Sequence, residues 1–410
     1  MASQGPEQKG PPQSESQKKR LWPLLGVNFF MADMQSGIGP FVGVFLAQRG
    51  WESGLIGTAM TIGNVAGMLI TTPVGGFIDT SHHKRAWVIV PGAAVVAASS
   101  IILFWQNFWA VAASQVATGI ASAAIVPAVT GITLGMVAQK GFNRQNGRNQ
   151  AFNHAGNMIG AAVSGFLGWK FGYFWVFVLA ALFGAITVAC VFMIPPDTIN
   201  HHIARGNKED DPEHRPSGMT VLLKHKPLIV LALALAVFHL GNAAIVPLYG
   251  LSAVTGKDAN GPGFVATIIV IAQGTMVVAS VVAMHIAEKR NYWMLILASF
   301  LALPLRGIFA CFLTGWWGVV PVEILDGIGA GLQSVAVPGM VARALYSTGR
   351  VNLAQGAVIT IQGAGASVSP ALGGWIAQSV GYSPTFLILG GMGLLAAAIW
   401  VAMRGAIKHL

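Results

Sequence analysis

Four ionisable side chains lie inside long apolar stretches of the chain, where a charge is costly. They are Asp33, Arg306, Glu323 and Asp326. An ionised side chain at the centre of a bilayer costs about 2.5–3.5 kcal/mol on insertion scales, so each residue invites a functional hypothesis. Burial favours the neutral carboxylic acid, which would let Asp33 take up and release a proton. We predict Asp33 as the leading proton-coupling residue, with a structurally hydrogen-bonded aspartate as the alternative.

Glu323 and Asp326 form a second candidate pair for proton coupling. They stand three residues apart, so they share one face of a helix, and Gln333 follows on the same face. Two neighbouring carboxylates resist being ionised together. Arg306 precedes them at a similar expected depth, which predicts a buried ion pair or triad. The alternative for Arg306 is a peripheral side chain that extends toward the headgroups.

Uncharged polar residues recur on single faces of the apolar stretches. Gln115, Thr118 and Ser122 share one such face, and His239 and Asn242 share another. Polar faces of this kind can line a cavity between helices. The predicted cavity set consists of Gln35, Gln115, His239, Asn242, Gln273, Gln333 and Gln362. The alternative is that these side chains only join helices, at about 0.6 kcal/mol each.

Motifs for covalent chemistry are missing from the sequence. It has no Walker motif, nucleophile elbow or zinc-binding His-Glu pattern, so we expect neither an enzyme nor ATP hydrolysis. His82 with His83, and His201 with His202, lack a Cys, Asp or Glu that would complete a metal set. We expect no metal and no cofactor, solvated loop histidines, and energy from a proton gradient.

Apolar stretches long enough to cross a bilayer dominate the chain, of which 54% is hydrophobic and only 9% charged. A spanning helix needs about 20 apolar residues, whereas a barrel strand needs about ten alternating ones. The stretches are centred near residues 34, 66, 95, 122, 162, 184, 239, 274, 302, 330, 366 and 394. They predict an all-α membrane protein with twelve transmembrane helices.

The polar segments divide this series into two halves. We predict a disordered tail over 1–20, six helices over 21–194, a charged linker over 195–226, six helices over 227–404 and a short tail over 405–410. Placing both termini in the cytoplasm puts most of the 24 lysines and arginines on that side. The net charge of +10 is then explained by membrane orientation rather than by nucleic acid. We expect a multi-pass protein of the cell (inner) membrane.

The two halves repeat one another. A shift of about 208 residues aligns FWAVAASQVATGIASA, which begins at 108, with WWGVVPVEILDGIGAG, which begins at 316. The motif from Pro40 to Gly43 likewise matches the motif from Pro247 to Gly250. A duplicated six-helix unit predicts two bundles that face each other across a central cavity.

The loop PVGGFIDTSHHKR resembles the signature loop of the major facilitator superfamily, carried here by Gly75, Asp79, Lys84 and Arg85. The resemblance covers essentially the whole chain and implies that this loop is a cytoplasmic gate between the bundles. It also implies that the first, fourth, seventh and tenth helices line the cavity. The loop departs from the signature at Thr80, where a basic residue is expected, and a topogenic charge cluster is the alternative.

Two further family marks are altered. Gln115 stands where many proton-coupled members carry an arginine before the glycine at 119, and Ala161 stands where the antiport pattern has proline. A proton relay through that arginine is therefore excluded. Because this proline is replaced, the sequence supports antiport less strongly than it supports the fold.

Together these features predict a secondary active transporter that moves a small organic solute by alternating access, coupled to protons, with efflux as the preferred direction. The alternative is a proton symporter that takes up a sugar, a nucleoside-like solute or a carboxylate. A third hypothesis, from another functional class, is a transporter-like receptor or scaffold that signals through the linker. The expected partners are a small-molecule substrate, protons and the lipid bilayer, and we expect a monomer.

Overall fold

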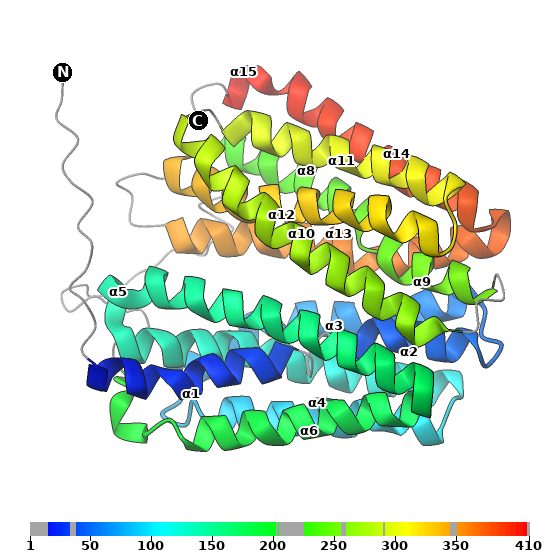
Figure 1. The fold of residues 1–410 in the computed structure, drawn as a ribbon. Coiled ribbons are helices and arrows are strands. Elements are labelled where there is room, and N and C mark those ends of the chain that lie inside the picture. The colour runs from blue at the N-terminus through cyan, green and yellow to red at the C-terminus, as the bar shows by residue number, and fades with distance from the viewer. Residues whose placement is uncertain are drawn as a thin grey trace.

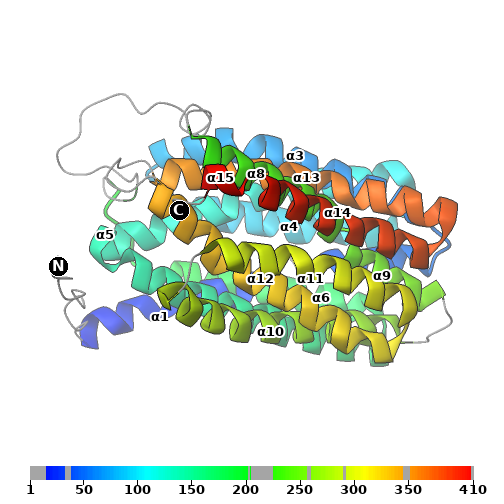
Figure 2. The same ribbon diagram turned by 90° about the horizontal axis from the view of Figure 1, so that it is seen from above.

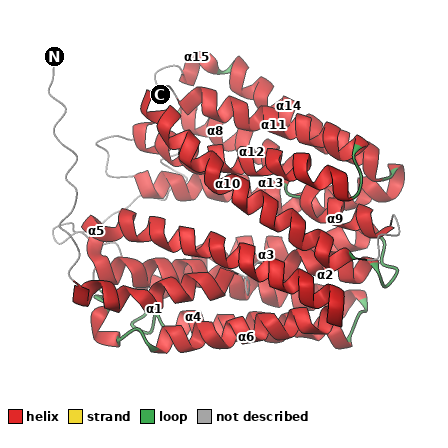
Figure 3. Cartoon of the chain, in the orientation of Figure 1, coloured by secondary structure: helices red, strands yellow, loops and turns green. Residues whose placement is uncertain are grey.

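The computed structural model describes residues 15–32, 38–201, 204, 225–255, 260–289, 292–344 and 351–407. Within these ranges every regular element is helical, and short loops join successive helices (Figure 3). The helices of both halves run in nearly the same direction (Figure 2). Because lipid offers no hydrogen-bond partners, a helix that satisfies its own backbone groups is the expected way for these apolar segments to cross it.

The first half forms one bundle. Its helices are α1 (Glu15–Ala32), α2 (Ile38–Ala47), α3 (Ser53–Thr80), α4 (Ala86–Phe104), α5 (Phe108–Phe171) and α6 (Tyr173–Phe192). The long α5 contains two crossings, because Ala138 has a left-handed φ of 55° that breaks the helix there. A short 3-10 turn, η2 (Pro196–Thr198), follows α6.

The second half forms the other bundle. Its helices are α8 (Lys226–Asn242), α9 (Ile245–Thr255), α10 (Gly261–Lys289), α11 (Tyr292–Phe312), α12 (Trp316–Ala344), α13 (Val351–Val380), α14 (Tyr382–Ala402) and α15 (Arg404–Ile407). Among the described residues, nine helical stretches are long and apolar enough to span a membrane. The other three predicted crossings correspond to α1 with α2, the second part of α5, and α13. The predicted all-α membrane fold is confirmed, and the series is consistent with twelve crossings.

Repeat-related positions meet at the pseudo-twofold axis between the bundles. Each half opens with a helix pair, α1 with α2 and α8 with α9. A Cβ on Gly43 would lie 3.4 Å from Leu251 of α9, and one on Gly250 would lie 3.4 Å from Val44 of α2. The two repeat-related positions therefore face each other where α2 and α9 are in contact across the bundle interface.

The bundles separate toward one end of the molecule. In Figure 1 α2 and α9 lie near the right-hand end, where the halves meet, whereas α1 begins and α15 ends at the left. The Ser53 hydroxyl donates to the Gly374 carbonyl at 3.0 Å, and the Ala371 amide donates to Thr61 at 2.9 Å. These bonds join the first half of α3 to the last half of α13. Toward the other ends of these helices, Cβ atoms on Gly75 and Gly356 would meet open space.

Several elements extend into segments predicted to be tails or linker. Helix α1 begins at Glu15, inside the expected 1–20 tail, and α15 lies mostly beyond residue 404. At the start of the expected linker, Ile199 is buried and the Asn200 amide donates to the Gly135 carbonyl of α5 at 3.0 Å. The first part of the linker is thus packed against the first bundle. Most of 202–224 lies outside the described residues.

Candidate functional site

A cavity of about 720 Å³ lies between the bundles. It is bounded mainly by α2, α3 and α5 on one side and by α9 and α13 on the other. Polar groups reach it from α3, α5 and α13, including Asn64, Gln115, Thr118 and Ser367. No ionisable side chain is among the described residues of its lining. The cavity therefore offers hydrogen bonds rather than charge to a solute.

Close packing of α3 on α5 gives the cavity its wall. A Cβ on Gly119 would overlap the carbonyl oxygen of Gly63, so the two helices meet backbone to backbone there. Thr118 and Ser122 follow Gln115 at helical spacing, and all three line the cavity beside this contact. The two glycines thus allow α3 and α5 to pack closely, while the polar face of α5 remains accessible from the cavity.

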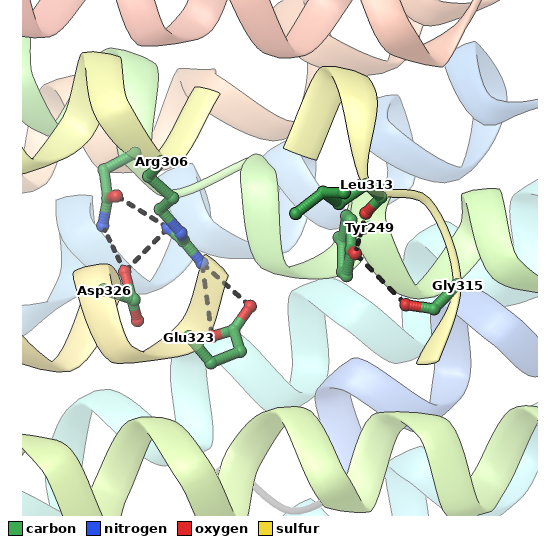
Figure 4. A network of polar contacts seen from close by, with 7 residues as sticks. Tyr249, Arg306, Leu313, Gly315, Glu323 and Asp326 are labelled. Carbon is green, nitrogen blue, oxygen red and sulfur yellow. Dashed lines mark hydrogen bonds and ion pairs between the residues drawn. The ribbon is translucent and has the colours of Figure 1, made fainter. Parts of the chain in front are cut away.

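A buried charged cluster lies in the second bundle. Nη1 of Arg306 lies 2.7 Å from Oδ1 of Asp326, and Nη2 lies 3.2 Å from Oε1 of Glu323 (Figure 4). Asn242 completes the cluster, since its Oδ1 accepts from Nη1 of Arg306 at 2.8 Å and its Nδ2 donates to Asp326 at 3.2 Å. Arg306 and Glu323 are 1% and 0% exposed, whereas Asp326 is 17% exposed.

The hairpin of α11 and α12 explains why these charges meet. Arg306 and Glu323 stand at nearly equal distances along the chain from the loop at 313–315, so antiparallel helices place them at the same depth. Tyr249 of α9 secures that loop by donating to the Leu313 carbonyl, with the Gly315 carbonyl 3.3 Å from its hydroxyl (Figure 4). The register of the two helices is therefore held from outside the hairpin.

The cluster has two carboxyl groups and one guanidinium. If all three were ionised, it would carry one net negative charge in a medium where an uncompensated charge is costly. One bound proton would neutralise it. Asp326 is the more accessible of the two carboxylates, and Asn242, its partner, directly precedes Ala243, which lines the cavity.

The other predicted cavity residues are dispersed. Gln273 lies 2.7 Å from Nδ1 of His154 and joins α10 to α5 across the bundle interface. Gln333 turns toward α11 and donates to Ser299 at 3.3 Å. Nε2 of His239 is buried without a hydrogen bond to the described residues, and Gln362 precedes a cavity-lining glycine. Of the predicted set, Gln115 alone lines the described cavity. Asp33 and Gln35 lie outside the described residues.

The signature loop makes its described contacts within the first bundle. Lys84 is buried, and its Nζ donates to the carbonyl of Ile78 at the end of α3 at 2.8 Å. The Arg85 guanidinium lies 5.6 Å from the ring centre of Phe192. Gly75 borders open space, and the side chain of Asp79 lies outside the described part of the structure. The predicted gate residues thus line the end at which the bundles stand apart.

Two polar residues, one in the cavity lining and one in a contact between the bundles, were not predicted from the sequence. Asn64 is a single amide in the apolar stretch that forms α3, and its isolation there was the available signal. His154 had no such signal, because it lies among several polar residues of the second part of α5 and its partner, Gln273, belongs to the other half.

This arrangement of two helical bundles around a central cavity agrees with comparisons to known proteins. The family model for the Major Facilitator Superfamily matches residues 24–351. The chain belongs to the major facilitator superfamily. It is accordingly an integral membrane protein of a family that transports small solutes.

Relatives of this superfamily member are found in two strains of Mycobacterium tuberculosis. The uncharacterized MFS-type transporters Rv2456c and MT2531 are each 35% identical to it over 370 residues, covering 89% of this chain and 88% of theirs. Among solved structures, the nucleoside transporter NupG has a TM-score of 0.74 at 14% identity, and a mutant of it has 0.77 at 13%. The match covers 94% of this chain and at least 98% of NupG, and it shows the shared fold.

Proposed function

We propose that this protein is a proton-coupled secondary transporter that moves a small, uncharged, hydrogen-bonding organic solute by alternating access. The observation that carries the proposal is the one-sided closure of the cavity. Ser53 and Thr61 bond to α13 at one end of the bundle interface, whereas Gly75 and Gly356 border open space at the other. Such a cavity is reached from one side of the membrane at a time, and rocking of the bundles would expose it to the other.

The charged cluster supports proton coupling. Asp326 is partly exposed and shares Arg306 with the sealed Glu323, so a proton arriving at Asp326 would remove the excess negative charge. Loss of that charge weakens the bond network that ties α8 to α11 and α12 through Asn242. Protonation could in this way change the packing of helices beside the cavity. Asp33 stays a candidate for the same role.

Transport measurements on purified protein in proteoliposomes test this proposal. We expect an imposed pH gradient to drive accumulation of a solute, and Asp326→Asn to reduce that accumulation at least about ten-fold while leaving solute exchange intact. Asp33→Asn and Glu323→Gln, measured beside it, would assign the coupling among the three carboxyls.

The matched control is Asp197→Asn, which removes an exposed carboxylate in the η2 turn outside the helical bundles. It is expected to transport like the wild type. Gradient-driven accumulation of the wild-type level by all three intramembrane variants would refute proton coupling through these groups. Binding without any flux across a broad solute panel would favour a receptor or scaffold instead.

The two main candidate functions, efflux and uptake, differ in the direction of transport. Efflux is our first proposal, and uptake by proton symport is the second, favoured by the amides of Asn64 and Gln115 in a cavity whose described lining has no charge. Nucleosides and sugars bind through hydrogen bonds of this kind, so both belong in the first solute panel. Comparing right-side-out with inside-out vesicles separates uptake from efflux.

We further infer that the open end faces the cytoplasm of a cell whose inner membrane holds the protein as a monomer. The loop with Lys84 and Arg85 lies at this end, and basic loops are retained on the cytoplasmic side. Labelling of a cysteine introduced at Gly405 from either side of sealed vesicles tests the orientation. Labelling from the outside of right-side-out vesicles would show that the inferred membrane orientation is reversed.

A further inference from the structure

A second cavity, of about 380 Å³, lies at the end of the first bundle and away from the space between the bundles. The loop between α3 and α4 forms one side of it, and the segment after α6 forms the other. His82 and Arg85 come from the loop, whereas His201 comes from the segment after η2. The central cavity and the charged cluster of the second bundle use none of these residues.

The rim of this cavity is basic. His82, His83, Lys84, Arg85 and His201 all belong to its lining, and the described lining contains no aspartate or glutamate. The rings of His82 and His201 lie 5.3 Å apart between centres, so the two sides of the rim approach each other. Lys84 is buried in this lining, and its ammonium donates to the carbonyl of Ile78 at 2.8 Å. The rim therefore attracts an anion.

The lower wall of the cavity is apolar and faces outward. Val90 of α4 and Phe192 of α6 line it and are 66% and 63% exposed. Apolar side chains exposed on the outside of a membrane bundle face lipid hydrocarbon. Arg85, over the ring of Phe192, stands where the apolar wall meets the basic rim. A cationic rim above an apolar wall matches a phospholipid, whose phosphate lies just above its acyl chains.

The segment that carries His201 is held in place rather than free. Ile199 and Ala204 are buried, and a Cβ on Gly135 of α5 would come within 3.0 Å of Ile199 and 3.1 Å of Ala204. The Asn200 backbone bonds to the same glycine at 3.0 Å. This contact fixes His201 opposite His82 and makes the rim a preformed site.

We propose that this cavity binds the headgroup of an anionic phospholipid, with the phosphate among His82, His201 and Arg85 and one acyl chain along Val90 and Phe192. A free phosphate would use the rim but would gain nothing from the exposed apolar wall, so a membrane lipid is the ligand that fits both parts. A bound lipid would join the loop after α3 to the first part of the linker. It would thereby stabilise the end of the bundle at which the two halves separate.

Lipid titration of the purified full-length protein in detergent tests the site, by native mass spectrometry and thermal unfolding. Phosphatidylglycerol is compared with phosphatidylcholine of the same acyl chains, and inorganic phosphate forms a third arm. We expect phosphatidylglycerol to bind and protect most strongly. Equal effects of the two lipids, or full protection by phosphate alone, would overturn the assignment.

Variants of the cavity distinguish the contribution of the basic rim to lipid binding from that of the apolar wall. We expect His82→Gln with His201→Gln to weaken phosphatidylglycerol binding about ten-fold, because both imidazole rings lie on the rim where the phosphate would bind. Phe192→Ala is expected to weaken lipid binding as well, without altering the effect of phosphate. His285→Gln, an exposed histidine on α10, is the matched control and should bind like the wild type. Arg85→Gln gives a second rim variant if the double change impairs folding, and unchanged binding in these rim variants would refute the site.

Discussion

The two bundles derive from one repeated unit, yet they hold different chemistry at equivalent positions. The repeat relates Gln115 to Glu323 and Thr118 to Asp326. In the first bundle these positions are uncharged and line the cavity. In the second they are carboxylates held by Arg306 away from the described cavity lining. The two halves thus share their helix packing but differ in charge and in which of these positions line the cavity.

The shared part of the comparison is close backbone packing. Gly119 and Gly327 are repeat-related, and each is a point of contact with a neighbouring helix. A Cβ on Gly119 would overlap Gly63 of α3, and one on Gly327 would lie 2.7 Å from the carbonyl oxygen of Ala272 in α10. The close helix packing thus depends on the glycines, whereas the bundles differ in charge at the residues four positions before and directly before them.

The largest effect is expected from breaking the charged cluster. Arg306→Ala leaves Glu323 buried beside Asp326 without a cation, and such unpaired buried charges cost about 3–5 kcal/mol. We expect a marked fall in the thermal unfolding temperature, measured in detergent. Arg144→Ala, which removes an exposed arginine of α5, is the control.

The double variant Arg306→Ala with Glu323→Gln should regain part of the stability lost in Arg306→Ala alone, because it removes both a cation and a carboxylate. If the double variant is as unstable as the sum of the single variants, the pair does not interact. In that case the comparison between the bundles would concern packing rather than charge.

The next largest effect is expected from the repeat-related glycines, at which both bundles pack closely. Gly119→Ala and Gly327→Ala should each destabilise the protein by about 1–3 kcal/mol, because the new Cβ atoms force the helix contacts apart. Gly274→Ala, whose Cβ meets open space, should be neutral or slightly stabilising. Thermal unfolding of the three variants gives the measurement. A loss at only one of the two repeat-related glycines would show that the bundles do not pack alike.

A smaller effect should separate the roles of two amides. Gln115→Ala removes a cavity hydrogen bond worth about 0.5–1.5 kcal/mol, so the KM for solute should rise several-fold with coupling unchanged. Gln333→Ala in the second bundle removes a bond to Ser299 and should leave the KM unchanged. A larger KM effect from Gln333 would assign solute binding to the second bundle.

The smallest effect is expected from the contact between His154 and Gln273, which is one of several that join the bundles. His154→Ala removes its contact with Gln273 and should shift the equilibrium between open and closed states by only about 0.6 kcal/mol, or less than three-fold. Hydrogen exchange in α5 and α10 would measure the shift. Thr58→Ala, which removes a 2.9 Å bond from Trp375 at the closed end, provides a comparison of similar size. A much larger shift would make the His154 contact the main latch.

Much of this molecule could be predicted from its sequence. The length of the apolar stretches requires membrane helices, because lipid leaves backbone groups no other partners. The repeat requires two similar bundles, and the separation of Glu323 from Asp326 places both carboxylates on one helix face. The expected meeting of Arg306 with these carboxylates could be predicted because a short loop joins their helices and therefore aligns their depths.

Only the tertiary structure decided which polar faces meet. Periodicity gives the polar face of each helix but not the direction in which the helix is turned, so Gln115 and Gln333 looked alike in the sequence although one lines the cavity and the other bonds to Ser299. The contact between His154 and Gln273 depends on how the two bundles are placed, which no local pattern encodes. The basic cavity at His82 and His201 also depends on tertiary packing. The contact of Ile199 with α5 holds the segment after α6 beside the loop between α3 and α4.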